Sequence, residues 1–282
     1  METLAGLPGL EEVHSQLAGV IAVFRAEQDR RNTGSEVTRP AWKNLVFAGA
    51  PGSGKSRTAA AVGRAYKQLG LLSSGHLDEV PAMGLVGVTR AETGALVAGA
   101  ARRSTGGVLM ISDAHAWHGL PDRGQHVLWE LYKKLTEYRR ELRDQLALIL
   151  AGQAEPLRKL LYAAPPLAAR FRAVINFPGY TSAQLAAIFA ALAGEAGLSL
   201  APEAECKAAA LLAQAEAAHP CGNARLAVRL LNQVTAAQGR RLAASQGPQH
   251  PATLSTVTEA DVPEHLDRDG PSSDRSWSGQ YL

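Results

Sequence analysis

The sequence predicts a three-layer α/β domain built on a parallel sheet, followed by a smaller all-helical domain. Two observations lead to this prediction. Over the first 180 residues, short apolar runs of strand length alternate with helical patterns, which is typical of a parallel sheet with helices on both faces. From Thr181 the chain becomes alanine-rich and helical. We therefore expect domains at residues 1–180 and 181–266, with a polar, disordered tail at residues 267–282.

Five strands are expected in the first domain. An amphipathic helix over residues 11–29 precedes them, because its apolar residues recur at helical spacing. Asp78 and Glu79 interrupt one of the runs, so its strand signal is the weakest. In chain order the strands are Asn44–Ala48, Leu77–Val80, Val108–Ile111, Leu146–Ala151 and Val174–Phe177.

Four helices and no strands are expected in the second domain. Thr181 and Gln184 have the spacing of a capping box, which marks the start of the first helix. Pro202 suits the first turn of the second helix, and Gly222-Asn223 precedes a long third one. Thr258 with Asp261 could cap a last short helix.

The composition of the chain argues against several classes of function. The net charge is only +3, and no basic stripe with interleaved aromatic residues is visible, so a nucleic-acid partner is not expected. Cys206 and Cys221 form neither a zinc pattern nor a disulfide framework. His115 and His118, beside Trp117, are expected to be polar or packing residues. With no basic leader and no run of 18 apolar residues, we expect a soluble cytoplasmic protein without a membrane segment.

A glycine-rich loop carries the strongest functional signal. Its sequence fits the pattern GxxxxGK[ST], known as Walker A, between an apolar strand and an alanine-rich helix that runs to about Leu69. Backbone N–H groups of such a loop surround phosphates, Lys55 reaches the β- and γ-phosphates, and Ser56 offers a hydroxyl to Mg²⁺. We therefore predict binding of ATP or ADP with Mg²⁺. The expected binding residues are Gly49, Ala50, Pro51, Gly52, Ser53, Gly54, Lys55, Ser56 and Arg57.

The motifs also occur in a diagnostic order. After the loop come GHLDEV at 75–80, GGVLMISDAH at 106–115, LALILAGQ at 146–153, ARF at 169–171, INFPGYT at 175–181 and GNARLAVR at 222–229. Over residues 4–266 this order resembles the CbxX/CfxQ branch of AAA+ ATPases, which includes red-type rubisco activases and EccA ATPases. The resemblance implies a helical lid, ATP between the αβα subdomain and the lid, and a ring, commonly a hexamer, that acts on a protein client.

The resemblance also suggests roles for individual residues. Gly6 and Leu7, with Leu10, would lie near adenine, although a plain turn before a helix is an alternative. Arg170 matches the arginine finger that enters the neighbouring subunit's site, and Arg225 matches the lid arginine called sensor 2. Each could instead be a solvated arginine. Gln153 could orient the attacking water, and a structural turn role is equally compatible with its position.

Two features depart from the family pattern. Ser112-Asp113 stands where Asp-Glu is expected, which predicts a degenerate Walker B motif with Ser112 on the metal side and Asp113 as a weak base. Val88-Thr89 replaces the pore-loop aromatic in a shortened segment. Two functions therefore stay open: a slow ATPase that remodels a protein partner, or a nucleotide-gated scaffold subunit with little or no activity, in a homo- or hetero-oligomer. A nucleic-acid-directed P-loop protein is the third and least supported reading.

Overall fold

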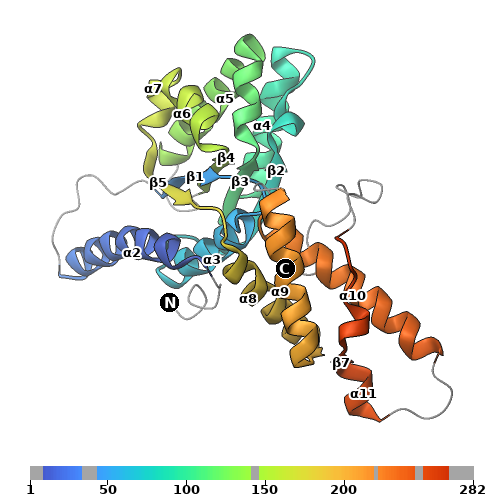
Figure 1. The fold of residues 1–282 in the computed structure, drawn as a ribbon. Helices are drawn as coiled ribbons and strands as arrows, with labels where there is room; N and C mark the ends of the chain where they lie inside the picture. Colours follow the sequence, from blue (N-terminus) through green and yellow to red (C-terminus); the bar gives the residue numbers. More distant parts are fainter. Residues whose placement is uncertain (1–8, 34–42, 141–145, 219–221, 245–249, 267–282) are drawn as a thin grey trace. The chain divides into compact units, whose positions relative to one another are not determined.

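The computed structural model describes residues 9–33, 43–140, 146–218, 222–244 and 250–266, which form two compact units (Figure 1). The first unit contains the described residues of Leu10–Ala50 and Gly54–Pro178. The second contains Gly9, Pro51–Ser53 and the described residues from Gly179 onward. The tip of the predicted phosphate loop therefore belongs with the second unit.

The first unit is built on a five-stranded parallel sheet in the order β2-β3-β4-β1-β5. All five predicted strands are confirmed. The last one begins at Phe171, three residues before the apolar run that predicted it, because its first residues alternate in exposure at the sheet edge. The strands are β1 (Asn44–Gly49), β2 (Leu77–Pro81), β3 (Val108–Ser112), β4 (Ala147–Gly152) and β5 (Phe171–Phe177).

Helices cover both faces of this sheet, which confirms the three-layer prediction (Figure 1). One face carries α2 (Glu11–Asn32) and α3 (Lys55–Gln68), where Phe24 packs edge-on against Tyr66. The other carries the helices that follow β2, β3 and β4, which share a core with alternate strand residues such as Leu109 and Ile111. These elements are η1 (Ala82–Leu85), α4 (Arg90–Arg103), η2 (Ala114–Gly119), α5 (Pro121–Arg140), α6 (Ala154–Tyr162) and α7 (Pro165–Ala168).

Two glycines allow helix α3 to pack closely against the turn before β2. A β-carbon on Gly63 would overlap the carbonyl oxygen of Gly75, and a β-carbon on Gly75 would overlap that of Gly63. Gly75 also has a φ of +67°, in the left-handed region that favours glycine. The spacing between α3 and this turn therefore depends on two missing side chains.

The second unit is mostly helical. It contains α8 (Ser182–Glu195), α9 (Pro202–Ala218), α10 (Ala224–Ala244), α11 (Pro251–Ser255) and η3 (Glu259–Asp261). Capping boxes are present at Thr181 and at Thr258, where the sequence predicted them. The expectation of no strands is wrong, because β6 (Ser199–Leu200) pairs in parallel with β7 (Thr256–Val257). Strands of two residues are too short to leave an alternating pattern in the sequence.

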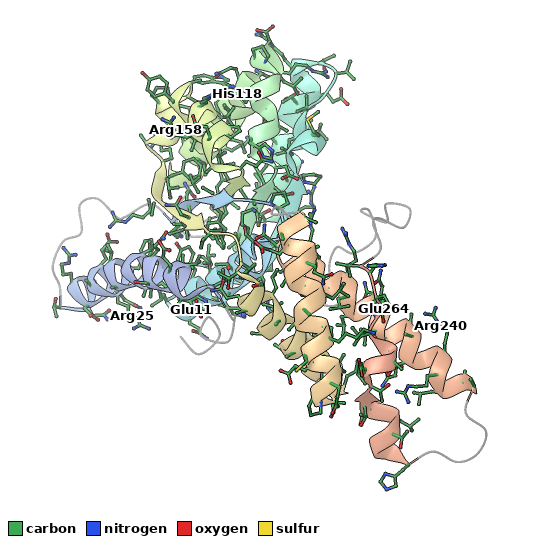
Figure 2. The ribbon with its side chains drawn as sticks, viewed as in Figure 1. Glu11, Arg25, His118, Arg158, Arg240 and Glu264 are labelled. Carbon is green, nitrogen blue, oxygen red and sulfur yellow. The ribbon has the colours of Figure 1, made fainter. Side chains whose placement is uncertain are left out.

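An ion pair with a buried carboxylate joins α10 to η3 in this unit. Asp261 is 1% exposed, and its carboxylate accepts hydrogen bonds from Arg241 and from the backbone and hydroxyl of Thr258. Burial acts to raise the pKa of Asp261, but these hydrogen bonds outweigh it, so the pKa lies below its usual value. Glu264, labelled in Figure 2, pairs with Lys207 at 2.7 Å on the exposed surface of the same unit.

Candidate functional site

The predicted phosphate loop joins β1 to α3. Gly52 and Gly54 have φ values of +73° and +89°, so both occupy the left-handed region that residues with side chains rarely adopt. The strand before the loop is buried, and the helix after it carries alanine and threonine on its buried face. Sequence and backbone therefore agree on a tight strand–loop–helix turn.

Lys55 is the first residue of α3, and its ammonium lies at the loop. It donates hydrogen bonds to the carbonyl oxygens of Gly49 at 3.0 Å and Ala50 at 2.6 Å. The first turn of α3 contains no acidic residue, and it also carries Ser56 and Arg57, both half-buried. The positive end of the helix dipole and two cationic side chains therefore coincide in one turn, which suits an anionic ligand.

Three consecutive loop carbonyls accept hydrogen bonds from residues that the sequence analysis did not select as functional. Asn223 Nδ2 donates to Pro51 O at 3.1 Å, the Ala224 N–H donates to Gly52 O at 3.2 Å, and Tyr180 Oη donates to Ser53 O at 3.2 Å. All of these residues belong to the second unit. These residues lie in two of the motifs that carry the resemblance, INFPGYT at 175–181 and GNARLAVR at 222–229, but the sequence gives them no role at the loop.

Ser112 and Asp113 lie at the end of β3. The strand pairs without a register shift, and its last residue, Ser112, lies opposite Pro81 of β2. Asp113 leaves the strand with a φ of +53° and ψ of 33°, and its side chain is 68% exposed. Its carboxylate lies 4.0 Å from His115 Nδ1. Ser112 therefore occupies the last strand position, and Asp113 the turn after it.

Gln153 follows β4 directly and is exposed. Its backbone N–H donates to His115 Nδ1 at 3.4 Å, and the imidazole packs against Gly152, where a β-carbon would lie 2.9 Å from the same nitrogen. His115 thus connects the ends of β3 and β4. His118, labelled in Figure 2, is exposed on η2. In the described part of the chain, no three histidine, cysteine, aspartate or glutamate side chains gather as a metal site.

Arg170 lies between α7 and β5, and both its backbone and its side chain have partners. Its carbonyl oxygen accepts a hydrogen bond from Asn44 Nδ2 at 3.0 Å, and its guanidinium lies over the ring of Tyr132. Trp129, which is 53% exposed, stacks on Tyr132 with ring centroids 5.6 Å apart. The arginine therefore belongs to a partly exposed aromatic cluster on α5.

The sheet separates these residues into two groups. The loop, Ser112-Asp113 and Gln153 follow β1, β3 and β4, which are neighbours, so they share the carboxyl edge of the sheet. Arg170 precedes Phe171, which pairs with Asn44 at the start of β1. A strand of this length spans about 17 Å. Arg170 is thus at the opposite edge of the sheet from the loop of its own chain.

Of the remaining predicted site residues, the structure describes Arg225 but not Gly6 or Leu7. Arg225 is exposed at the start of α10, and its Cγ would lie 3.1 Å from a β-carbon on Gly52. Gly6 and Leu7 lie outside the described residues. Their neighbour Leu10 is buried, and Gly9 packs so closely on the Tyr180 ring that a β-carbon would lie 2.8 Å from it.

Comparison with known proteins agrees with this architecture. The AAA lid domain family matches residues 181–272. The AAA domain of FIGL-1, solved in complex with ADP, superposes with a TM-score of 0.59 at 16% identity, covering 91% of this chain and 80% of that one. The five-stranded parallel sheet, its flanking helices and the helical second unit therefore define the AAA+ fold.

Two relatives are similar to this chain over most of its length. CfxQ of Xanthobacter flavus is 29% identical over 91% of this chain and 80% of its own length. CbbX of Cereibacter sphaeroides is 29% identical over 91% of this chain and 82% of its own length. Together with the motif order, these matches show that the chain is similar to CfxQ/CbbX-type AAA+ proteins over most of its length.

One further property concerns the helices. Among the residues that the structure describes, none forms a helix long and apolar enough to cross a membrane.

Proposed function

We propose that this chain binds ATP or ADP with Mg²⁺ at Gly49–Ser56 and hydrolyses ATP as a subunit of a ring that remodels a protein partner. The observation that carries the proposal is the loop itself. Left-handed glycines, the Lys55 ammonium and a helix start without acidic residues are together suited to a polyphosphate. The ADP complex of the FIGL-1 AAA domain, a protein of the same fold, supports this choice of ligand.

Each loop residue has a distinct task in this proposal. Backbone N–H groups of Gly49–Ser56 bind phosphate oxygens, and Lys55 exchanges its two carbonyl partners for the β- and γ-phosphates. Arg57 adds positive charge to the same turn of α3. Arg225, whose side chain lies beside Gly52, adds a further cation for the nucleotide.

The donor set also suits Mg²⁺. Ser56 and Ser112 would offer hydroxyl oxygens, which are the hard ligands that this ion prefers. When bound, the ion neutralises charge on the phosphates. Asp113 and Gln153 lie at the same sheet edge, where Asp113 acts as a weak base and Gln153 orients the attacking water. Because Asp113 is in a turn and one methylene shorter than glutamate, we expect slow hydrolysis.

Arg170 completes the site of a neighbouring copy. It cannot serve its own loop, since it lies at the other edge of the sheet. In a ring, an arginine at this edge meets the next subunit's nucleotide and stabilises charge that develops on the γ-phosphoryl group. The proposal therefore makes association a requirement for turnover.

The experiment that tests the proposal is a titration with a fluorescent ATP analogue. Lys55→Ala removes the ammonium partner of the phosphates, and binding should be lost. Lys67→Ala is the matched control, because Lys67 is exposed in the last turn of the same helix. Equal affinity of the wild type and Lys55→Ala would reject the proposed site.

A further inference from the structure

The outward side of the predicted phosphate loop is held by hydrogen bonds within the second unit. The carbonyl oxygens of Pro51, Gly52 and Ser53 each accept one, from the Asn223 side chain, the Ala224 backbone and the Tyr180 hydroxyl. Ser53 is fully buried, and Tyr180 is 6% exposed. Hydrogen bonds in such surroundings are costly to lose, because the remaining carbonyl is left without a partner.

Both the backbone and the side chain of Asn223 suit its position beside the loop. It is 2% exposed and has a φ of +47°, which asparagine tolerates better than most residues with a side chain. Both polar atoms of its side-chain amide form hydrogen bonds. Oδ1 accepts one from the Tyr180 N–H at 3.1 Å, and Nδ2 donates one to Pro51 O at 3.1 Å. Aspartate has the same shape but no donor, so only the amide satisfies both partners.

Tyr180 is fixed from two sides. Its backbone N–H is bound by Asn223, and its ring packs against Gly9. The hydroxyl is thereby directed at Ser53 O, 3.2 Å away. Tyr180 and Asn223 are thus hydrogen-bonded to each other, and their side chains bind two of the three loop carbonyls. The backbone of α10 binds the third carbonyl.

The direction of these carbonyls sets the direction of the loop N–H groups. In a planar trans peptide the C=O and N–H bonds point to opposite sides. Carbonyls of Pro51, Gly52 and Ser53 that point toward Tyr180 and Asn223 therefore leave the N–H groups of the following residues, Gly52, Ser53 and Gly54, pointing the other way. Under the proposed function, that side is where the phosphates bind.

From this geometry we infer that Tyr180 and Asn223 are positioning residues of the phosphate loop. They keep its N–H groups turned toward the phosphates before nucleotide arrives, and neither needs to touch the ligand. A loop that is held in the binding conformation only part of the time loses affinity in proportion to that fraction. The inference rests on the proposed nucleotide site.

The test compares nucleotide affinity in conservative variants of the full chain. Tyr180→Phe removes one hydroxyl, and we expect the Kd for a fluorescent ADP analogue to rise about threefold to tenfold, the usual range for one hydrogen bond. Asn223→Asp places an oxygen against Pro51 O and should raise the Kd at least about tenfold. Asn223→Gly keeps the left-handed backbone and should give a loss between the wild type and Asn223→Asp.

Controls separate positioning from a general loss of structure. Tyr162→Phe and Asn232→Asp make the same chemical changes at exposed positions and should leave the Kd unchanged. Inorganic pyrophosphate, which engages only the phosphate loop, should lose affinity by the same factor as the ADP analogue. The unfolding temperature without ligand is measured alongside, because a purely structural role would lower it while the Kd stayed constant.

The outcomes distinguish this inference from the proposed function. If the wild type does not bind the analogue, or Lys55→Ala binds it equally well, the proposed function fails and the inference fails with it. If the wild type binds, Lys55→Ala does not, and Tyr180→Phe keeps the wild-type Kd, the inference alone is overturned. The same holds if pyrophosphate affinity is unchanged while ADP affinity falls. Tyr180→Phe retains the whole ring, so it decides the question even if the Asn223 variants do not fold.

Discussion

Arg170 lies over the ring of Tyr132, with its guanidinium carbon 5.2 Å from the ring centroid and Nη2 3.5 Å from the phenol oxygen. The hydrogen bond from Arg170 lowers the pKa of the Tyr132 phenol below its usual value. In Arg170→Ala this pKa should therefore rise. It is measured as the difference between the ultraviolet pH titrations of each protein and its Tyr132→Phe counterpart. An unchanged titration would show that the two side chains do not interact in solution.

Replacing Arg170 should affect turnover more than binding. If the residue acts on a neighbour's nucleotide, its charge matters chiefly in the transition state, so Arg170→Ala should lower kcat about a hundredfold or more. The Kd for nucleotide should stay close to that of the wild type. The comparison requires ATP turnover and analogue binding on the same samples. A large rise in Kd instead would indicate that Arg170 contributes to its own chain's site.

Mixing two inactive proteins tests the shared site directly. Arg170→Ala lacks the finger, and Lys55→Ala lacks the phosphate partner, so mixed assemblies contain some complete sites and should regain activity. The specific activity of the wild type should also rise with protein concentration, because a ligand held between subunits favours their association. A strict monomer with constant specific activity and no rescue on mixing is the contrary outcome.

A carboxylate at the end of β3 should speed hydrolysis. Ser112 occupies the last residue of the strand in an unshifted register, so Ser112→Asp puts a carboxylate where the metal shell is proposed. We expect turnover at saturating Mg²⁺ to increase by up to about a hundredfold, the size of effect that placement of a catalytic group can have. Ser112→Asn has nearly the same shape without charge and serves as the control. Equal rates for the two variants would contradict the assignment.

The Arg241–Asp261 pair should contribute a pH-dependent part of the stability. Breaking it with Arg241→Met leaves a buried carboxylate without its charge partner, which should cost about 3 kcal/mol at pH 7. Because the pKa of Asp261 is lowered in the folded chain, this stabilisation is complete above its usual pKa of 3.8 and is lost as the pH falls through the lower folded value. The stability difference between wild type and variant should therefore shrink in acid.

Urea denaturation of the full chain between pH 7 and the acid limit of folding measures this difference. Lys207→Met is the control, since it breaks the pair with the 81% exposed Glu264 and should cost much less stability than Arg241→Met at pH 7. A stability difference for Arg241→Met that does not change with pH would exclude the ionised Asp261 as its source.

The sequence predicted the fold well because its elements carry local signals. Buried parallel strands such as β3 and β4 are continuous apolar runs, and the capping box at Thr181 marks a helix start within four residues. The first residues of β5, which alternate in exposure at the sheet edge, and the two-residue strands β6 and β7 lack such signals. Elements were therefore missed where only tertiary pairing defines them.

The candidate site was predictable to a smaller extent. The spacing of Gly49–Ser56 reveals the loop, but nothing local connects Ser53 with Tyr180, which is 127 residues away, or Pro51 with Asn223, which is 172 residues away. Likewise, the cation–π contact of Arg170 requires α5 to lie beside the end of α7, which Arg170 follows. Such partners depend on the folded backbone, and the local sequence pattern does not reveal them.

The close approach of Gly63 and Gly75 has a consequence for genetics. Any side chain at Gly63 would push α3 away from the turn before β2, and α3 begins with Lys55. A substitution at Gly63 would move that lysine without changing a residue of the loop. A screen for chains that no longer retain nucleotide should therefore recover alleles in the middle of this helix, two turns beyond the ligand, and their phenotype would copy that of a loop mutant.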